Sequence, residues 1–252
     1  MVAYNISFGQ GISMGPGISF GSGTGGGGGP NVSTQSIWVW DSNYVGPSLS
    51  LGQVNSWFNN NNGLPVTGNP TQEVYANNPE SSSVLGLIDG NGSLYDVGPL
   101  VMFTIYVNSE DTGDAAQGIA SVGVGNYNTD LTQPLGLTSD SWGWHQDGSM
   151  WGNGQLSNTG YPTWGPGDYL DIALNLNDGH AWVRVNGGDW NGRAGTDPAV
   201  GSHRITLPAG FVYNGSGSSG IFPAANPSAQ GFVDAMDAWY YTYSIPTGFV
   251  AI

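Results

Sequence analysis

Cysteine and lysine are both missing from this 252-residue sequence, and arginine occurs only three times, against 18 acidic residues and a formal net charge of −15. Without cysteine the chain can form no disulfide framework, no zinc–thiolate cluster and no thiol nucleophile. Arg184, Arg193 and Arg204 cannot supply the basic stripe that displaces counterions from phosphates. A Walker-type nucleotide site would lack its lysine. The composition therefore excludes nucleic acid and anionic membranes as partners, and Walker-type nucleotide hydrolysis as an activity.

Charged residues of either sign make up only 8% of the chain, so the surface must be solvated mainly by Asn, Ser, Thr and Gly. No apolar run is long enough to span a bilayer. The first residues, Met-Val-Ala-Tyr-Asn, lack the basic start and the continuous apolar stretch of a secretory signal. We expect a protein on the surface of a virion particle, or otherwise an extracellular one that leaves the cell by another route.

A hexapeptide repeat marks the amino-terminal part of the chain, where Asn5-Ile-Ser-Phe-Gly-Gln10 is followed by two further copies that end at Ser22. Because six is a multiple of the strand period of two, the apolar side chains of an extended repeat share one face and the serines point away. These apolar residues are Ile6, Phe8, Ile12, Met14, Ile18 and Phe20. We predict that residues 1–34 are an assembly arm that packs against neighbouring subunits; a flexible low-complexity tail is the alternative.

Residues 35–252 form the second predicted domain, and their pattern is that of an all-β protein. Short runs of alternating apolar and aromatic residues are separated by turn pairs such as Asp147-Gly148, and no stretch keeps an amphipathic helical period over three turns. The fold class predicted is an all-β antiparallel two-sheet sandwich. Strands are expected at residues 37–40, 84–88, 100–107, 119–124, 141–145, 169–175, 181–185, 203–207, 220–224 and 238–244. Whether residues 41–58 complete the sandwich or form an insertion is left open by the pattern.

Four motifs in order give the second domain a resemblance to a known family. They are Val122-Gly-Val124, Ser141-Trp-Gly-Trp-His-Gln-Asp-Gly148, the segment Gly167–Trp190 with its Gly-Asp opening and Asn-Asp-Gly turn, and Gly220-Ile-Phe-Pro-Ala-Ala225. This series resembles the SPRY family, and the closing Tyr243-Ser-Ile-Pro-Thr-Gly-Phe249 is similar to an element of SPRY-like modules in bacteriophage proteins. The resemblance implies a concanavalin A-like jelly-roll sandwich that serves binding and scaffolding rather than catalysis. Phe232–Trp239 departs from the family pattern.

Catalytic and metal-binding patterns are weak in this sequence. Gly-x-Ser-x-Gly occurs around Ser13 and Ser19, but inside the repeat, where the strand, helix and histidine of a nucleophile elbow are missing. Asp168 and Asp171 could in principle form a carboxylate pair, although the resemblance makes them a strand opening. Residues 89–93 match only the first half of a calcium loop and are better read as a hairpin turn. The three histidines share no ligand spacing and are interpreted as half-buried strand residues; they are His145, His180 and His203. We expect no enzyme activity, no catalytic residue, no metal and no cofactor.

Aromatic residues are the remaining candidates for a site. Trp142 and Trp144 alternate along one predicted strand, and we interpret both as core. Four others fall in loops rich in Gly, Pro and Asn, where core packing explains them less well, and we predict them to be ligand-binding: Trp151, Tyr161, Trp164 and Trp190.

The function hypothesis that follows is a virion structural protein, a bacteriophage capsid decoration, collar or fibre component. Its arm would dock into the particle, and its exposed sandwich would contact other virion proteins and further copies of the chain, with host surface glycans as an additional partner. The alternative is a carbohydrate-binding, lectin-like module of a cell-surface or secreted protein, with the loop aromatics as its sugar platform.

Overall fold

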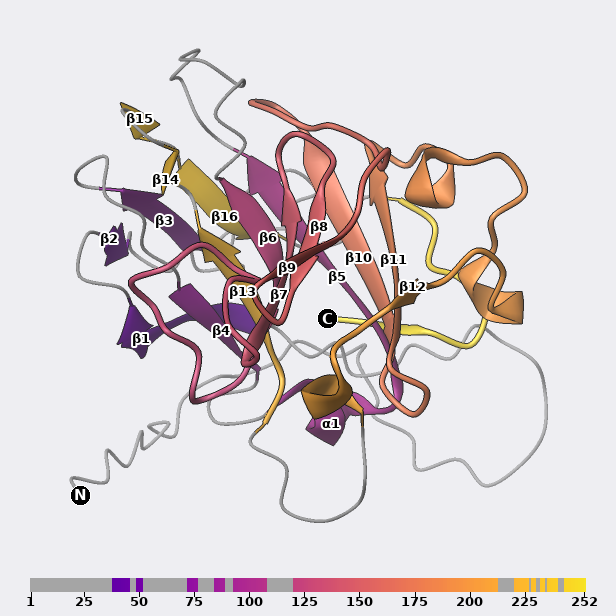
Figure 1. Ribbon diagram of the computed structural model, residues 1–252, viewed down its shortest axis with the longest axis horizontal. Helices are drawn as coiled ribbons and strands as arrows, with labels where there is room; N and C mark the ends of the chain where they lie inside the picture. Colours follow the sequence, from indigo (N-terminus) through magenta and orange to yellow (C-terminus); the bar gives the residue numbers. More distant parts are fainter. Residues whose placement is uncertain are drawn as a thin grey trace, which may run out of the picture. The chain divides into compact units, whose positions relative to one another are not determined.

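Two β-sheets face each other in the part of the chain that the computed structural model describes (Figure 1). The described residues are 38–45, 49–51, 72–76, 84–88, 93–107, 120–212, 220–226, 228–229, 232–233, 235–239 and 243–252. The predicted arm, residues 1–34, with its six apolar positions, lies outside these ranges, so its role stays a prediction.

The first sheet has seven strands in the order β1-β4-β13-β6-β7-β8-β9, and each strand is antiparallel to its neighbours. A strand from late in the sequence, β13, lies between two early ones. The strands are β1 (Trp38–Val45), β4 (Val84–Ile88), β13 (Phe222–Asn226), β6 (Ser121–Gly125), β7 (Ser141–His145), β8 (Met150–Gly152) and β9 (Gln155–Asn158).

The second sheet runs in the order β12-β11-β10-β5-β16-β3-β2, with a further short strand, β17 (Val250–Ala251), parallel to β5. Its other strands are β12 (Ile205–Thr206), β11 (His180–Val185), β10 (Tyr169–Asn175), β5 (Leu100–Val107), β16 (Ala235–Trp239), β3 (Gln72–Ala76) and β2 (Leu49–Leu51). The remaining elements are the separate pair β14 (Ser228–Ala229) and β15 (Phe232–Val233), the short helix α1 (Leu94–Val97), and the 3-10 turns η2 (Trp190–Gly192), η3 (Pro198–Val200) and η4 (Ala209–Phe211).

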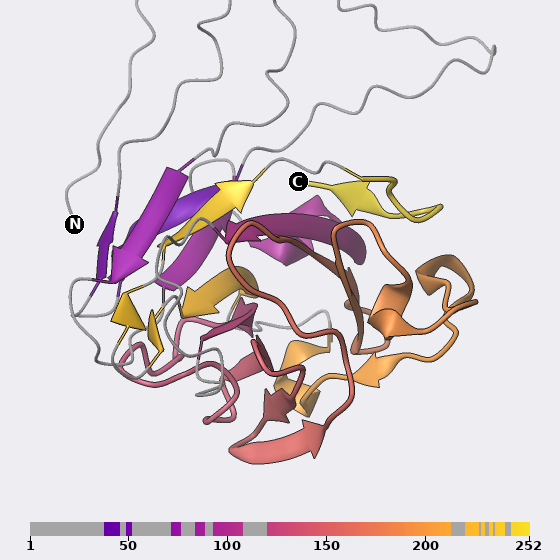
Figure 2. The ribbon, with the colours of Figure 1, turned by 90° about the horizontal axis from the view of Figure 1, so that it is seen from above.

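The main core lies between the two sheets, which Figure 2 shows as facing layers. Strand β5 illustrates why its residues form a strand that is covered on both faces: Phe103 and Ile105 point into the main core, while Met102 belongs to a second cluster on the outer face of the sheet. In β7, Trp142 and Trp144 are fully buried in the main core, as predicted. The all-β antiparallel two-sheet sandwich is thereby confirmed.

Strand prediction succeeded where the apolar pattern is long. The ranges 84–88, 100–107, 141–145 and 169–175 are confirmed as they stand. The prediction of 238–244 is correct only at its start, since β16 spans 235–239; residues 243 and 244 are not in a strand, and 240–242 lie outside the described residues. Of the strand predicted at 203–207, only Ile205 and Thr206 (β12) form a strand, because His203 has a φ of +48° and lies in the preceding turn. The open question on residues 41–58 is answered in part: β1 continues to Val45 and β2 adds a strand, so these segments complete the sheets.

Within the described ranges, no helix is both long and apolar enough to cross a membrane.

Candidate functional site

A pocket of about 340 Å³ lies at the lateral opening of the sandwich, where the last strands of the two sheets approach each other. Strand β9 ends the order of the first sheet, and β12 ends the order of the second. Residues from both ends line the pocket: Ser139, Trp142, Gly152, Asn153, Ser157, Thr206, Leu207, Pro208, Ala209 and Gly210.

Two glycines of the β8–β9 hairpin shape this pocket. The two-residue turn Asn153-Gly154 has φ values of +55° and +71°, which Asn and Gly adopt most readily and which match the twist of a tight hairpin. At Gly152 a Cβ atom would lie 3.0 Å from Cγ of Pro208 and 3.5 Å from Cδ1 of Trp142. A glycine at this position therefore lets the segment after β12 approach the hairpin closely enough to close the base of the pocket.

The chemistry of the pocket is neutral. Its polar groups are the hydroxyls of Ser139, Ser157 and Thr206 and the amide of Asn153, and none of the ten lining residues is ionisable. The fully buried Trp142 contributes apolar surface, and its indole Nε1 has no hydrogen-bond partner among the described residues. Such a lining has no group to act as a general acid or base near neutral pH, but it suits an uncharged ligand that carries hydroxyl or amide groups.

Two of the predicted aromatic residues are half-buried in or near this hairpin: Trp151 is the middle residue of strand β8, so its predicted loop position is wrong, and Tyr161 follows β9. The ring of Trp151 stacks on that of His145, with centroids 5.7 Å apart, and its Nε1 donates to Oγ of Ser149 at 3.0 Å. Tyr161 packs against the main core, and its hydroxyl accepts a 3.2 Å hydrogen bond from the amide of Asn158. Burial raises the pKa of Tyr161, and the Asn158 contact opposes this shift. Part of each ring remains accessible.

The other two predicted aromatics are buried, so their expected place on an exposed platform is wrong. Trp164 is 5% exposed and packs edge-on against Trp144 at 6.2 Å between ring centroids. Trp190 is 7% exposed, and the guanidinium carbon of Arg184 lies 4.2 Å from its ring centroid. Trp164 belongs to the main core and Trp190 to the second cluster, and burial of each indole removes much apolar area from water.

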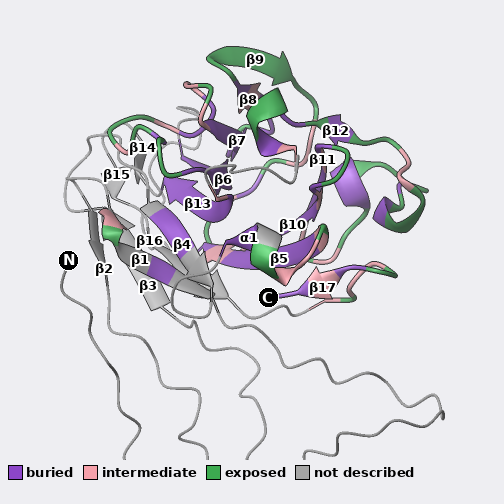
Figure 3. Ribbon diagram, turned by 90° about the horizontal axis from the view of Figure 1, so that it is seen from below, coloured by how far each residue is buried: buried purple, intermediate pink, exposed green. Residues whose placement is uncertain are grey.

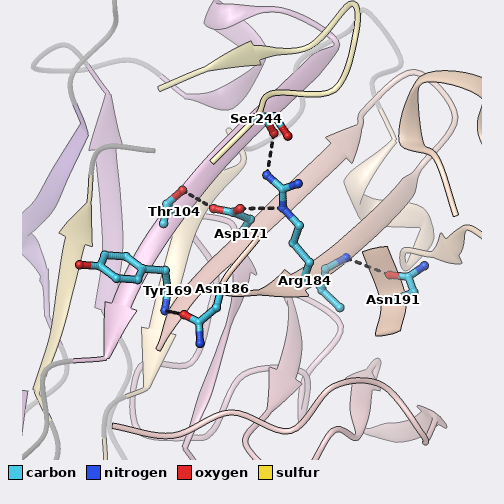
Figure 4. Close-up of polar contacts among 8 residues, drawn as sticks. Thr104, Tyr169, Asp171, Arg184, Asn186, Asn191 and Ser244 are labelled. Carbon is cyan, nitrogen blue, oxygen red and sulfur yellow. Dashed lines mark hydrogen bonds and ion pairs between the residues drawn. The ribbon is translucent and has the colours of Figure 1, made fainter. Parts of the chain in front are cut away.

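Asp168 and Asp171 have different partners and different surroundings, and Figure 4 shows those of Asp171. The fully buried Asp171 accepts hydrogen bonds from Nε of Arg184 at 2.8 Å and from the Thr104 hydroxyl at 2.6 Å. Burial raises the pKa of Asp171, while the Arg184 charge and the hydrogen bond from Thr104 oppose this shift. Asp168 instead accepts from the Asn186 side chain at 2.7 Å and from a backbone amide. The two carboxylates therefore hold the start of β10 and the β10–β11 ladder, as the resemblance implied.

The remaining candidates are scattered. His145 is a buried residue of β7 with Nε2 2.9 Å from the carbonyl oxygen of Leu135, and His180 is a partly exposed residue of β11. The prediction of His203 as a half-buried strand residue is wrong, since it is exposed in a turn. The calcium-like residues 89–92 and the serines of the repeat lie outside the described residues.

Sequence reasoning missed strands β8 and β9 and with them the pocket. The Asn153-Gly154 pair, the strongest short hairpin signal in this region, would have located the turn. No sequence signal indicated that residues 206–210 line the pocket, because this depends on how closely the end strands of the two sheets, β12 and β9, approach each other.

No family model matches the sequence, and no curated protein matches it. The structure is similar to the SPRY domain of human HERC1, with 14% identity over 66% of this chain and 86% of that chain and a TM-score of 0.44. It is also similar to the PSpry domain of TRIM65, with 13% identity over 81% and 93% of the two chains and a TM-score of 0.47. A third similar structure is stonustoxin, with 12% identity over 80% of this chain and 26% of that chain and a TM-score of 0.45. All three TM-scores lie below 0.5, and the similarity concerns the fold alone.

Proposed function

We propose that this chain is a non-enzymatic structural and interaction protein of a virion surface, a bacteriophage capsid decoration, collar or fibre component. Residues 1–34 dock into the particle. The sandwich is exposed there and contacts other virion proteins and further copies of the chain.

The observation that carries this proposal is a long surface segment without charge, which we call the uncharged hairpin surface (Gly148–Gly167). None of its residues is charged, and residues 153–160 are all exposed. Half-buried Trp151 and Tyr161 lie within it. The centres of protein interfaces are depleted of charged residues and enriched in Trp and Tyr, whereas a surface that only meets water needs no such composition. The segment therefore has the composition of a contact surface.

The best-defined ionic group of the described residues supports a structural role as well. The carboxylate of Asp171 is enclosed with Arg184 and Thr104, so it holds two strands together and cannot reach a ligand in solution.

The test compares the full chain with a version that starts at Gln35, by light scattering after size exclusion at several concentrations. We expect the full chain to form defined oligomers and the truncated chain to be a monomer. If both versions are monomers at every concentration, the arm is no self-assembly device and the proposal fails in that part.

Carbohydrate binding is the second candidate, and the neutral pocket favours it. Its hydroxyl and amide groups can exchange hydrogen bonds with a neutral sugar, and Trp142 and Leu207 provide apolar surface. Binding of neutral oligosaccharides is measured by calorimetry on residues 35–252. Asn153→Gly keeps the left-handed turn and Thr206→Val keeps the shape of the side chain, so each removes polar atoms with little change of fold. We expect each to weaken binding about tenfold, the loss of roughly one hydrogen bond. Thr163→Val, on an exposed residue that does not line the pocket, is the matched control.

A further inference from the structure

Among the described residues, strand β9 is an open edge of the first sheet. It pairs with β8 on one side, ends the strand order, and all four of its residues are exposed (Figure 3). Leu156, at its centre, is 49% exposed, which is unusual for a large apolar side chain in a strand. The backbone groups on the outer side of such an edge are a template for a further strand.

Proteins protect their sheet edges with charge, proline, bulges or short length, and β9 has only the last two of these devices. An extra residue between Leu156 and Asn158 forms a bulge, and the strand has four residues. Of the three other ends of the two sheets, two carry stronger protection, while β2 (Leu49–Leu51) has neither charge nor proline and is protected only by its length of three residues. Arg204 and Pro208 flank β12, and Asp41 lies within β1. Strand β9 therefore accepts a short strand, of about the length of one hexapeptide.

The amino-terminal repeat has the complementary pattern. In extended form each Ile-Ser-Phe or Ile-Ser-Met unit places two apolar side chains on one face and the serine on the other. Apolar residues that lie opposite or diagonal to each other on paired strands stabilise the pairing, so Leu156 would contact the apolar face of one unit. The repeat carries no charge between Asn5 and Ser22, so no repulsion opposes its approach to the uncharged hairpin surface.

The strand order separates the point where the repeat is attached from β9 of the same molecule. Residues 1–34 precede β1 in the chain, and β1 and β9 are the opposite ends of the same sheet. A contact from the β1 end of one molecule to the β9 end of the next is head-to-tail, and repetition of such a contact produces rings or filaments.

We propose that β9 is the acceptor edge for the hexapeptide repeat, residues 5–22, of a second copy of this chain, which pairs with it as an added strand. The inference rests on the proposed assembly role of residues 1–34 and names its partner surface. One short pairing is weak, and the three copies of the hexamer raise its occupancy because they offer equivalent registers.

The first experiment uses the cysteine-free background, in which every protein disulfide must involve an introduced cysteine. One preparation carries Met14→Cys and a second carries Leu156→Cys; the two are mixed, oxidised with glutathione disulfide and digested for mass spectrometry. We expect a linked peptide pair that joins positions 14 and 156. A mixture in which Val200→Cys, on a 76% exposed residue, replaces Leu156→Cys is the control and should give several-fold less.

The second experiment measures self-association of the full chain by light scattering. Leu156→Lys places a charge on the edge and should weaken association about tenfold or more, whereas Val200→Lys makes the same change on another exposed apolar residue and should have no effect.

If arm removal abolishes association but Leu156→Lys and Val200→Lys behave alike, the acceptor lies elsewhere; the inference is then overturned and the proposed function stands. If a chain that carries both Met14→Cys and Leu156→Cys forms only an intramolecular disulfide, pairing of β9 with the repeat of a second copy is excluded. If the full chain is a monomer at every concentration, this inference is overturned and the proposed function loses its self-assembly part.

Discussion

Arg184 and Asp171 lie on neighbouring strands of the second sheet, directly opposite each other in the β10–β11 register, and are joined by a 2.8 Å contact from Nε to Oδ2 with both side chains buried. The same guanidinium donates from Nη2 to the carbonyl oxygen of Ser244 at 2.6 Å and lies over Trp190. Arg184 thus connects the ladder to the carboxyl-terminal segment and to the η2 turn.

Replacement of this arginine should be costly. Arg184→Met leaves the Asp171 carboxylate buried without its counter-charge, and we expect the free energy of unfolding to fall by about 3–5 kcal/mol. Chemical denaturation followed by tryptophan fluorescence measures this. Arg193→Met, on an exposed arginine, should change stability by less than about 0.5 kcal/mol.

The stability of Arg184→Met should also depend on pH in a defined direction. Burial raises the pKa of Asp171, and the loss of the Arg184 charge removes a group that opposes this shift. In Arg184→Met the folded state then binds the Asp171 proton more tightly than the unfolded state, so stability is greatest below the ordinary Asp pKa of about 3.9 and falls as the pH rises through the raised value. Chemical denaturation of Arg184→Met and of the unchanged protein between pH 3 and 7 tests this. A loss of stability that is equal at pH 3 and pH 7 would contradict it.

A comparison of the two tryptophans of β7, Trp142 and Trp144, measures how much one buried hydrogen bond contributes to stability. Nε1 of Trp144 donates to the carbonyl oxygen of Pro162 at 2.9 Å, whereas Nε1 of Trp142 has no partner among the described residues. Trp144→Phe and Trp142→Phe both leave a cavity, but only the first leaves a carbonyl without its donor. We expect Trp144→Phe to cost about 1–3 kcal/mol more in thermal or chemical unfolding. Equal costs would show that the Pro162 contact contributes nothing.

Two effects, backbone conformation and lack of space, require glycine at Gly187, and they can be measured separately. The φ of Gly187 is +68°, and a Cβ atom there would overlap the ring of Tyr243. Gly195 has a φ of +80° with open space around it. Gly195→Ala should therefore lose about 1 kcal/mol through backbone strain alone, while Gly187→Ala adds the cost of moving the ring, about 1–3 kcal/mol more. Melting temperatures of the two variants measure the difference.

We expect the phenol of Tyr169 to ionise at a higher pH than an ordinary tyrosine. Burial, followed by the neighbouring Tyr106 and Tyr243, raises its pKa above the ordinary value of about 10. Because the folded state holds this proton more tightly than the unfolded state, the stability that the neutral phenol contributes is complete below pH about 10 and is lost as the pH rises through the raised pKa. Ultraviolet titration of the tyrosines follows this, and Tyr243→Phe should move the late step to lower pH.

Local patterns were sufficient to predict the fold class and several strands, because β5 and β10 are apolar over most of their length and β7 alternates tryptophan with small or polar residues. They were insufficient for β8 and β9, whose sequences, Met-Trp-Gly and Gln-Leu-Ser-Asn, carry little apolar periodicity. These strands exist because β7 offers an edge and the Asn153-Gly154 turn returns the chain to it.

Residue type alone could not separate the four predicted aromatics. Trp151, in strand β8, and Tyr161 remain partly accessible, whereas Trp164 packs in the main core and Trp190 in the second cluster. The pocket was beyond prediction for a related reason, since it joins residues 139–157 with 206–210 across the gap between two sheets.

The central position of β13 in the first sheet and of β16 in the second has a consequence for biosynthesis. Strand β13 lies between β4 and β6, yet the ribosome makes it 97 residues after β6 ends, since 222 − 125 = 97. At about 5–20 residues per second, the nascent chain carries unpaired β4 and β6 edges for roughly 5–20 s before translation delivers their common neighbour. During that interval the polypeptide is a substrate for chaperones, and a premature stop codon upstream of β13 would yield a product that aggregates rather than a smaller domain.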